Sequence, residues 1–326
     1  HESDNFGLQA SLGQVNLDDV MGRVKKVIAE IEPHDSKERF ESLGVDVFLS
    51  DINIINKHTV KIEGKTITGK NIVIATGSEP FVPGINGLEK VPYYTNKSIF
   101  DMKKMPQHLI VVGGGPIGLE LGQGFRHLGA EVTIIDKAES LFRKDEPEVW
   151  SLMNKTLDSD RINLELSSEV SRIEKNGDEI LVHIKQNKIN KTIRGDTLLI
   201  ASGRTPNSRG FGLEELGVEM DNRGFIQTNK RQQTNIKNIF AAGDITGPYL
   251  FTHMAGYQAV KIIPNALLKI PQKVNYSAVP WTTYTKPEVA HIGYTEEQAK
   301  NNGNLKGKVF LDLGDNDRAK AESDKN

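Results

Sequence analysis

Three glycines at a fixed spacing, Gly113, Gly115 and Gly118, are residues that could bring the backbone close to a phosphate. They follow the apolar run at 109–112, and an amphipathic helix pattern begins directly after them. The first glycine allows a tight turn, the second lets the backbone approach a pyrophosphate, and the third lets helix and strand pack closely. Unpaired N–H groups at the helix start then face the phosphates. The pattern predicts a dinucleotide-binding site.

A carboxylate follows at the position where such a site holds its ribose. Asp136 ends a second apolar run, at 132–135, and lies near the expected spacing of about 20 residues. It can accept hydrogen bonds from both ribose hydroxyls, whereas it would repel the 2′-phosphate of NADP. Asp136 therefore favours NAD over NADP, although Lys137 and Arg143 follow it closely.

Two further glycine turns follow apolar strands, at 74–78 and 240–244. In each, the strand ends at small residues where a ligand can touch the backbone. Asp244 adds a carboxylate that could accept hydrogen bonds from a polyol such as ribitol. Each turn alone is equally well an ordinary strand end, but together with the glycine pattern they favour a second ligand site.

The hydrophobic periodicity predicts the elements that carry these turns. After Asn16, which can cap a helix, apolar residues recur about every 3.6 residues. Asp35 and Glu38 stand at capping-box spacing, and Gly44 would end that second helix. The expected helices cover 16–31, 35–43, 147–157, 253–268 and 296–301. The expected strands cover 45–49, 59–62, 71–75, 168–175, 179–185, 191–194, 197–202, 239–241, 281–283, 291–294 and 309–313.

Length, charge and cysteine content limit the classes of protein that fit. The 326 residues suffice for two or three domains, and the net charge of −2 favours neither nucleic acid nor an anionic membrane surface. No apolar run approaches the roughly 18 residues of a membrane span. The absence of cysteine excludes disulfides, thiolate metal sites and a cysteine nucleophile within this sequence. No histidine pair has convincing metal-ligand spacing, so we expect no metal site. A cytoplasmic location is the default expectation.

At this point several motifs, taken in order, resemble a known family. They are ATGS at 75–78, GGGPIGLE at 113–120, SGRTPN at 202–207, FAAGD at 240–244, FTHMAGYQA at 251–259 and TKPEVAHIGYTEEQA at 285–299. The same order is found in the class I flavin-dependent pyridine nucleotide–disulfide oxidoreductases. The chain is most similar to dihydrolipoamide dehydrogenases and to mercuric-reductase-like proteins.

The resemblance implies an α/β fold with two Rossmann-like dinucleotide-binding domains, the FAD domain incomplete, plus the start of an α+β dimer-interface domain. Residues 1–95 would be the C-terminal part of the FAD-binding domain, and 96–215 the NAD-binding domain. Residues 216–272 would return to the FAD or central domain, and 273–326 would be a truncated dimerisation domain. FAD and NAD are the implied cofactors.

The resemblance also assigns roles on the NAD side. The NAD pyrophosphate would be held at the glycine turn by Gly113, Gly115, Pro116, Ile117 and Gly118. Asp136 would hold the adenosine ribose, and Val170 would line the adenine pocket. Glu120 would lie beside the nicotinamide and pair with a lysine near the flavin, the alternative being a solvated helix glutamate. Gly203 would approach the nicotinamide.

On the flavin side, the implied cofactor-binding residues are Ala75, Thr76, Gly77, Arg204, Asp244, Thr252 and His253. Asp244 would bind the ribityl chain, and Arg204 would bridge the nucleotide domain to the flavin side. Thr252 and His253 would present backbone N–H groups at a helix start to the flavin's electron-rich edge. For the imidazole of His253, capping or packing is a better interpretation than acid–base chemistry.

Some parts of the family pattern are missing. The sequence has no N-terminal glycine fingerprint for FAD, no CxxxxC redox pair and no terminal His–Glu pair. Either the chain is a fragment lacking both ends or it is an intact but degenerate member. The abrupt ends favour a fragment, because a domain cut through its sheet leaves unpaired strand edges.

We therefore predict an FAD-dependent, NAD-linked dithiol/disulfide oxidoreductase, most like dihydrolipoamide dehydrogenase, with its redox cysteines outside this sequence. Its substrate would be a small-molecule or lipoyl-type dithiol, and the full-length protein would be a homodimer with neither nucleic acid nor membrane as partner. This stretch alone is expected to be inactive. The alternatives are a mercuric-reductase-like flavoprotein using NAD(P)H and a non-catalytic nucleotide-binding fragment.

Overall fold

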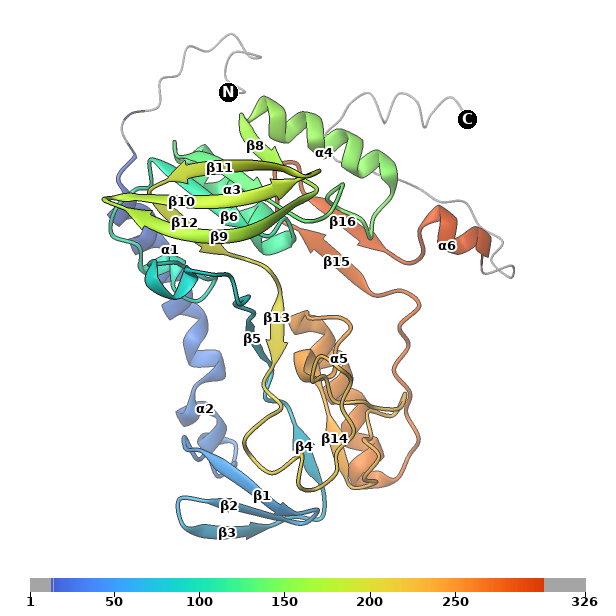
Figure 1. Cartoon of the computed structure of the whole chain (residues 1–326). Helices are drawn as coiled ribbons and strands as arrows, with labels where there is room; N and C mark the ends of the chain where they lie inside the picture. Colours follow the sequence, from blue (N-terminus) through green and yellow to red (C-terminus); the bar gives the residue numbers. More distant parts are fainter. Residues whose placement is uncertain (1–12, 14, 302–326) are drawn as a thin grey trace. The chain divides into compact units, whose positions relative to one another are not determined.

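The computed structural model describes residue 13 and residues 15–301, which form two compact units (Figure 1). Within the described residues, the first unit comprises the chain up to 44 together with 83–141 and 151–201. The second comprises 45–82, 142–150 and the chain from 202 onward. Both parallel and antiparallel strand pairs occur, so the predicted α/β class is confirmed.

The first unit is built on a parallel sheet with the strand order β12-β6-β7-β8. Its strands are β12 (Thr197–Ile200), β6 (His108–Val112), β7 (Glu131–Ile135) and β8 (Ile162–Glu165). Nearly every residue of β6 and β7 is buried, as expected for a parallel sheet covered on both faces. The apolar runs on either side of the glycine turn are therefore adjacent strands of one sheet.

Alternate residues of these strands serve the two faces of the sheet. Ile110 and Val112 pack with the antiparallel meander β9 (Ser168–Asn176), β10 (Glu179–Gln186) and β11 (Ile189–Gly195), which confirms the predicted meander. On the opposite face, Val111 and Ile134 lie against α3 (Pro116–His127). The order of layers is helix, parallel sheet and meander (Figure 1).

The helices at the start of the first unit show one correct and one wrong cap prediction. Asn16 caps α1 (Leu17–Ile31) through its side chain, as predicted. The second helix, α2 (Lys37–Ser42), is capped by Ser36, whose hydroxyl accepts from the N–H of Arg39, so Asp35 is not the cap. Residues Glu32–Asp35 instead form a 3₁₀ turn, and Gly44 ends the segment in a left-handed conformation.

Further 3₁₀ turns cover Leu88–Lys90 and Ile99–Asp101. Helix α4 (Pro147–Ser159) starts as predicted.

In the second unit, an antiparallel sheet joins β1 (Ile52–Asn56), β2 (Thr59–Ile62) and β3 (Lys65–Thr68). The strand predicted over 45–49 is wrong, because those residues have no regular partner and β1 begins three residues later. Ile54 pairs with Val60 and is buried, whereas Leu49 is largely exposed. The strand therefore forms where its apolar residues reach a core.

Two short strand pairs carry the second set of predicted site residues. β4 (Ile72–Ile74) runs parallel to β14 (Ile239–Ala241), and both contribute to one apolar cluster. β5 (Ser78–Pro80) runs antiparallel to β13 (Arg204–Pro206). Because β4 and β14 are parallel neighbours, the turns that follow them leave the same edge.

The rest of the second unit is helix and hairpin. The 3₁₀ turn Gly243–Thr246 leads to α5 (Thr252–Ile263), whose last turn continues as a π turn at Pro264–Leu268. Strands β15 (Pro280–Thr283) and β16 (Val289–Ile292) pair antiparallel, and α6 (Glu296–Asn301) follows. The predicted strand at 309–313 lies outside the described residues. No helix in the described part of the chain is long and apolar enough to cross a membrane.

Candidate functional site

The predicted dinucleotide turn lies between β6 and α3, and its three glycines differ in what surrounds them. Gly113 has φ +117°, a conformation that side chains disfavour. A Cβ on Gly118 would lie 1.9 Å from the carbonyl oxygen of Gly113, so only glycine allows the helix to start here. A Cβ on Gly115 would meet nothing within 4 Å. The backbone at Gly115 therefore faces open space that a pyrophosphate could enter.

Asp136 lies at the rim of this turn and is bonded to it. Its Oδ2 accepts the N–H of Gly114 at 2.6 Å, and its Oδ1 accepts the N–H of Ala138 at 2.7 Å. A carboxylate offers about four lone-pair sites, so each oxygen retains capacity for a ribose hydroxyl. Asp136 both fixes the turn and keeps acceptors available.

Gly114 also belongs to the candidate turn, and the spacing argument missed it. A Cβ there would lie 2.4 Å from Leu141 Cδ2 and 3.2 Å from Asp136 Oδ2. The middle glycine of the row 113–115 was visible in the sequence. Its need for glycine was not, because the crowding comes from side chains more than 20 positions away in the chain.

The Asp136 side of the turn is formed by the beginnings and ends of neighbouring strands. The N–H of Asp136 donates to the carbonyl of Glu165, and the N–H of Ser168 donates to the carbonyl of Asp136. These bonds place the start of β9 beside Asp136. Val170, two residues further along β9, is half-buried against the meander core, a position compatible with an adenine pocket.

The remaining predicted residues of the turn lie on α3. Pro116 is the first helical residue, where its missing N–H costs nothing, and Ile117 is half-buried. Glu120 is half-buried one turn further along and already has an interaction partner. Its position near a helix N-terminus stabilises a carboxylate whether or not a ligand is present.

In the second unit, Arg204 and Asp244 meet through a serine. The hydroxyl of Ser78 donates to Asp244 Oδ2 at 2.6 Å, and Arg204 Nε lies 2.6 Å from that hydroxyl and 3.3 Å from Oδ2. A second guanidinium N–H donates to the carbonyl of Ser78 at 2.8 Å. Both contacts to the carboxylate fall on Oδ2, and within the described residues Oδ1 has no hydrogen-bond partner. That oxygen is available to a polyol hydroxyl.

Ser78 was not among the predicted site residues. It is the last residue of the ATGS motif and begins β5, directly after the predicted residues Ala75, Thr76 and Gly77. A hydroxyl next to a predicted ligand turn was the available signal. Its actual role required the pairing of β5 with β13, which brings Arg204 alongside.

The turn after β4 is held by Asn207. The Thr76 hydroxyl donates to the carbonyl of Asn207 at 2.7 Å, and the Asn207 side-chain amide donates back to the carbonyl of Thr76 at 2.9 Å. A cavity of about 500 Å³ adjoins Thr76 and includes Ser208, whose buried hydroxyl has no hydrogen-bond partner. A buried hydroxyl without a protein partner in a cavity wall is the kind of group that a ligand or water satisfies.

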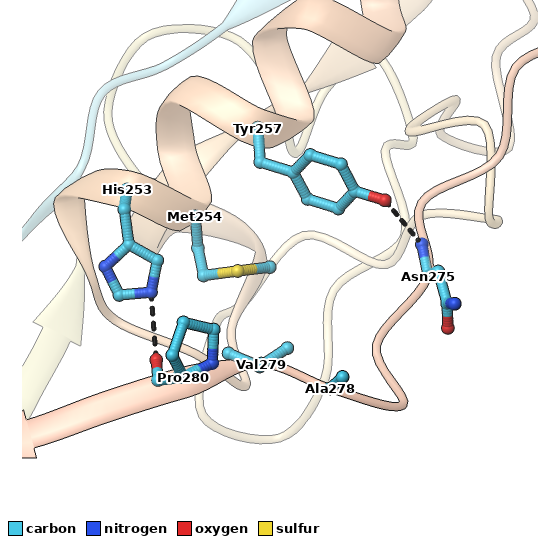
Figure 2. Close-up of a pocket in the computed structure, with 7 residues that line it drawn as sticks. All are labelled: His253, Met254, Tyr257, Asn275, Ala278, Val279 and Pro280. Carbon is cyan, nitrogen blue, oxygen red and sulfur yellow. Dashed lines mark hydrogen bonds between the residues drawn. The ribbon is translucent and has the colours of Figure 1, made fainter. Parts of the chain in front are cut away.

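Figure 2 shows a second cavity, of about 310 Å³, at the start of α5. The N-cap residue of α5 is Phe251, whose side chain cannot accept a hydrogen bond. The first-turn N–H groups of Thr252 and His253 therefore have no capping side chain. The His253 imidazole contacts the carbonyl of Pro280 at 3.0 Å and stacks on Phe251. The imidazole ring is thus held by stacking on Phe251 and by its contact with the Pro280 carbonyl.

Gly203 precedes β13 and is exposed, with φ +132°. Its carbonyl accepts the N–H of Phe81, which extends the pairing of β5 with β13 by one bond. A Cβ there would meet nothing within 4 Å, but the backbone conformation itself favours glycine. Among the described residues there is no group of three or more His, Cys, Asp or Glu side chains that could hold a metal ion.

Comparison with known proteins identifies the family. Residues 9–267 match the family described as pyridine nucleotide-disulphide oxidoreductase, and residues 279–326 match the dimerisation domain of that family. The chain therefore belongs to the pyridine nucleotide-disulphide oxidoreductases, as its motifs predicted.

Curated relatives of two kinds are similar over most of the chain. A mercuric reductase of Lysinibacillus sphaericus is 36% identical over 298 residues, which are 91% of this chain and 55% of that protein. A dihydrolipoyl dehydrogenase of Bacillus subtilis (strain 168) is 34% identical over 266 residues, covering 79% and 56%. The chain thus spans little more than half the length of these relatives.

A solved structure is similar as well. The HOCl-induced flavoprotein disulfide reductase RclA from Escherichia coli superposes with a TM-score of 0.82 at 27% identity, covering 95% of this chain and 71% of the other. The relatives therefore include three differently named members of one family, and family membership does not by itself choose among them.

Proposed function

We propose that this chain is the nucleotide-binding part of an FAD-dependent, NAD-linked dithiol/disulfide oxidoreductase, most like dihydrolipoamide dehydrogenase. The observation that carries the proposal is the Asp136 carboxylate bonded to the glycine turn, beside a backbone face at Gly115 that is open to a pyrophosphate. Family membership supplies the reaction class.

The NAD side uses backbone and carboxylate groups. The turn at Gly113 to Gly118 would hold the pyrophosphate through amides at the start of α3, where the helix dipole also favours an anion. Asp136 would accept the adenosine ribose hydroxyls, which makes NAD the preferred nucleotide. Glu120 would lie beside the nicotinamide.

The flavin side uses the residues of the second unit. FAD, when bound, supplies the group that exchanges hydride with the nicotinamide and electrons with a thiol pair. Asp244, with Oδ2 held by Ser78 and Arg204, would bind the ribityl chain through Oδ1. Main-chain amides at Thr252 and His253 would face the flavin edge where negative charge develops on reduction. The turn at Ala75 to Gly77 would complete the flavin contacts, and Gly203 would approach the nicotinamide.

The thiol half of the reaction needs a cysteine pair that these 326 residues do not contain. This chain alone should therefore bind nucleotides without reducing or oxidising a dithiol. Within a complete protein, the substrate would be a small or lipoyl-type dithiol and the assembly a homodimer, as the match to a dimerisation domain supports.

A mercuric-reductase-like activity is the second candidate, favoured by the 36% identity to a protein of that name. Electrons would then run from the nicotinamide through the flavin to a bound metal ion as substrate. That chemistry also requires thiols beyond this sequence, so a third outcome, a nucleotide-binding module without turnover, must be tested together with it.

The test is a titration of the purified chain, incubated with FAD and then freed of unbound flavin. Retained flavin that bleaches when NADH is added anaerobically supports the redox proposal. A colourless protein that still binds NADH would reduce the assignment to a bare nucleotide-binding module, and failure to bind NADH would overturn it. In a complete protein, assays with dihydrolipoamide and with Hg²⁺ separate the two enzyme candidates.

A further inference from the structure

The rim of the proposed adenosine site carries more carboxylates than Asp136 alone. Glu165 ends β8 and Glu169 begins β9, and backbone hydrogen bonds tie both strands to Asp136. Each of these glutamates holds a lysine: Glu165 contacts Lys191, and Glu169 contacts Lys137. Lys191 and Lys137 are thus each paired with a carboxylate at this rim.

Lys137 is the cation that matters most for nucleotide choice, because it follows Asp136 directly. Its ammonium lies 2.7 Å from Glu169 Oε1, a hydrogen-bonded ion pair that holds the pKa of Glu169 below its usual range. Without that partner, an ammonium one residue from Asp136 could reach an anionic group on the adenosine ribose. A 2′-phosphate is such a group, and NADP sites use nearby cations to hold it.

We propose that Glu169 is a specificity-determining residue that excludes NADPH by capturing the ammonium of Lys137. The inference rests on the proposed NAD site and adds a second level of discrimination to it. Asp136 repels the phosphate directly, and Glu169 both adds negative charge and removes the nearby cation that would compensate for it. Selectivity then depends on an acidic pair rather than on one carboxylate.

Glu169 is the better target of the two glutamates. The Glu165 side chain is only 11% exposed, at the end of a core strand, whereas Glu169 and Lys137 are 63% and 74% exposed. Replacing Glu169 should therefore leave the fold intact. Lys185 also interacts electrostatically with Glu169. Replacing Glu169 therefore leaves two lysines, Lys137 and Lys185, near the rim without that carboxylate.

The experiment compares the dissociation constants of NADH and NADPH for the wild-type chain and Glu169→Gln at low ionic strength. We expect NADPH to bind roughly two- to fivefold more tightly to the variant, the size of one exposed charge pair, with NADH little changed. The gain should shrink as salt is added. Adding Lys137→Met to Glu169→Gln should remove most of the gain.

The matched control is Glu179→Gln. Glu179 forms an exposed pair with Arg194 in the same meander, so its replacement makes the same change in net charge away from Asp136. Equal NADPH affinities in the Glu169→Gln and Glu179→Gln variants would overturn the role of Glu169 while leaving NADH binding intact. If the wild-type chain binds neither nucleotide, the NAD site itself fails, and this inference with it.

Discussion

The indole of Trp281 lies flat against the imidazole of His291, with ring centroids 3.9 Å apart and 9° between the planes. The two residues face each other across the β15–β16 hairpin. Asp145 approaches this pair from the segment before α4. Its Oδ1 accepts the indole N–H at 3.0 Å and lies 3.5 Å from His291 Nδ1. A carboxylate only 7% exposed thus fastens residues 142–150 to the hairpin.

We predict that Asp145→Asn makes the protein more stable at neutral pH. Burial raises the pKa of Asp145 above its usual value, and this effect exceeds the opposing hydrogen bond from Trp281 and the charges of His291 and Lys144. A raised carboxyl pKa means that the favourable contribution is present at acidic pH and is lost as the pH rises through that pKa. Asparagine keeps the oxygen acceptor but carries no charge. Urea unfolding at a series of pH values from acidic to neutral would measure the increase in the free energy of unfolding of Asp145→Asn. It would also show whether that free energy depends less on pH than in the wild-type chain.

The control for this prediction is Trp281→Phe, which removes the indole N–H and leaves the buried Asp145 carboxylate without that donor. The free energy of unfolding should fall by about 1–3 kcal/mol. The decrease should be largest at pH values where Asp145 is ionised. If Asp145→Asn instead lowers stability at neutral pH, attraction to His291 outweighs burial, and the proposed sign is wrong.

A second prediction compares two glycines of α3. Gly118→Ala places a methyl group 1.9 Å from the Gly113 carbonyl oxygen, so the turn must open, and NADH binding should be lost together with several kcal/mol of stability. Gly124→Ala meets nothing within 4 Å on the exposed side of the same helix. It should stabilise the protein by roughly 0.5–1 kcal/mol, because alanine is the better helix former. Thermal unfolding and NADH titration of the two variants measure the contrast, and similar behaviour would mean that the turn does not depend on close packing at Gly118.

The sequence was sufficient for elements whose signals are local. The glycine turn, the meander after α4 and the Asn16 cap depend on residues within a few positions of one another, and each formed as predicted. The predicted strand at 45–49 failed because its apolar residues had no core to face, which periodicity alone cannot reveal. The cap at Asp35 failed because Ser36, one residue later, competed for the same helix N-terminus.

Candidate site residues could be proposed from sequence where a motif names them, but not where long-range contacts bring them together. Asp136 and Asp244 were proposed from their positions at strand ends. The Ser78 bridge, the crowding at Gly114 and the Asp145 contact with the hairpin join residues far apart in sequence. Such contacts follow from strand pairing and packing, so a single sequence gives no spacing from which to infer them.

Nucleotide preference gives a third prediction. Asp136→Asn keeps one acceptor oxygen for the turn but loses the charge, and NADH affinity should fall about tenfold, the cost of a hydrogen bond to a charged group. Asp136→Arg should shift preference towards NADPH. Paired titrations with NADH and NADPH measure both variants, and unchanged selectivity in Asp136→Arg would refute the ribose role of this residue.

The flavin side gives the last prediction. Asp244→Asn should raise the dissociation constant of FAD about tenfold or more, because a charged acceptor for the ribityl chain is replaced by a neutral one. Ser78→Ala should cost less, since it removes only the hydroxyl that holds Oδ2 while Arg204 stays 3.3 Å from the carboxylate. Because the two side chains are in contact, their effects should be non-additive in the double variant. FAD fluorescence quenching on titration would measure all three constants. If Asp244→Asn retains FAD as well as the wild-type chain does, the carboxylate serves only to hold Ser78 and Arg204.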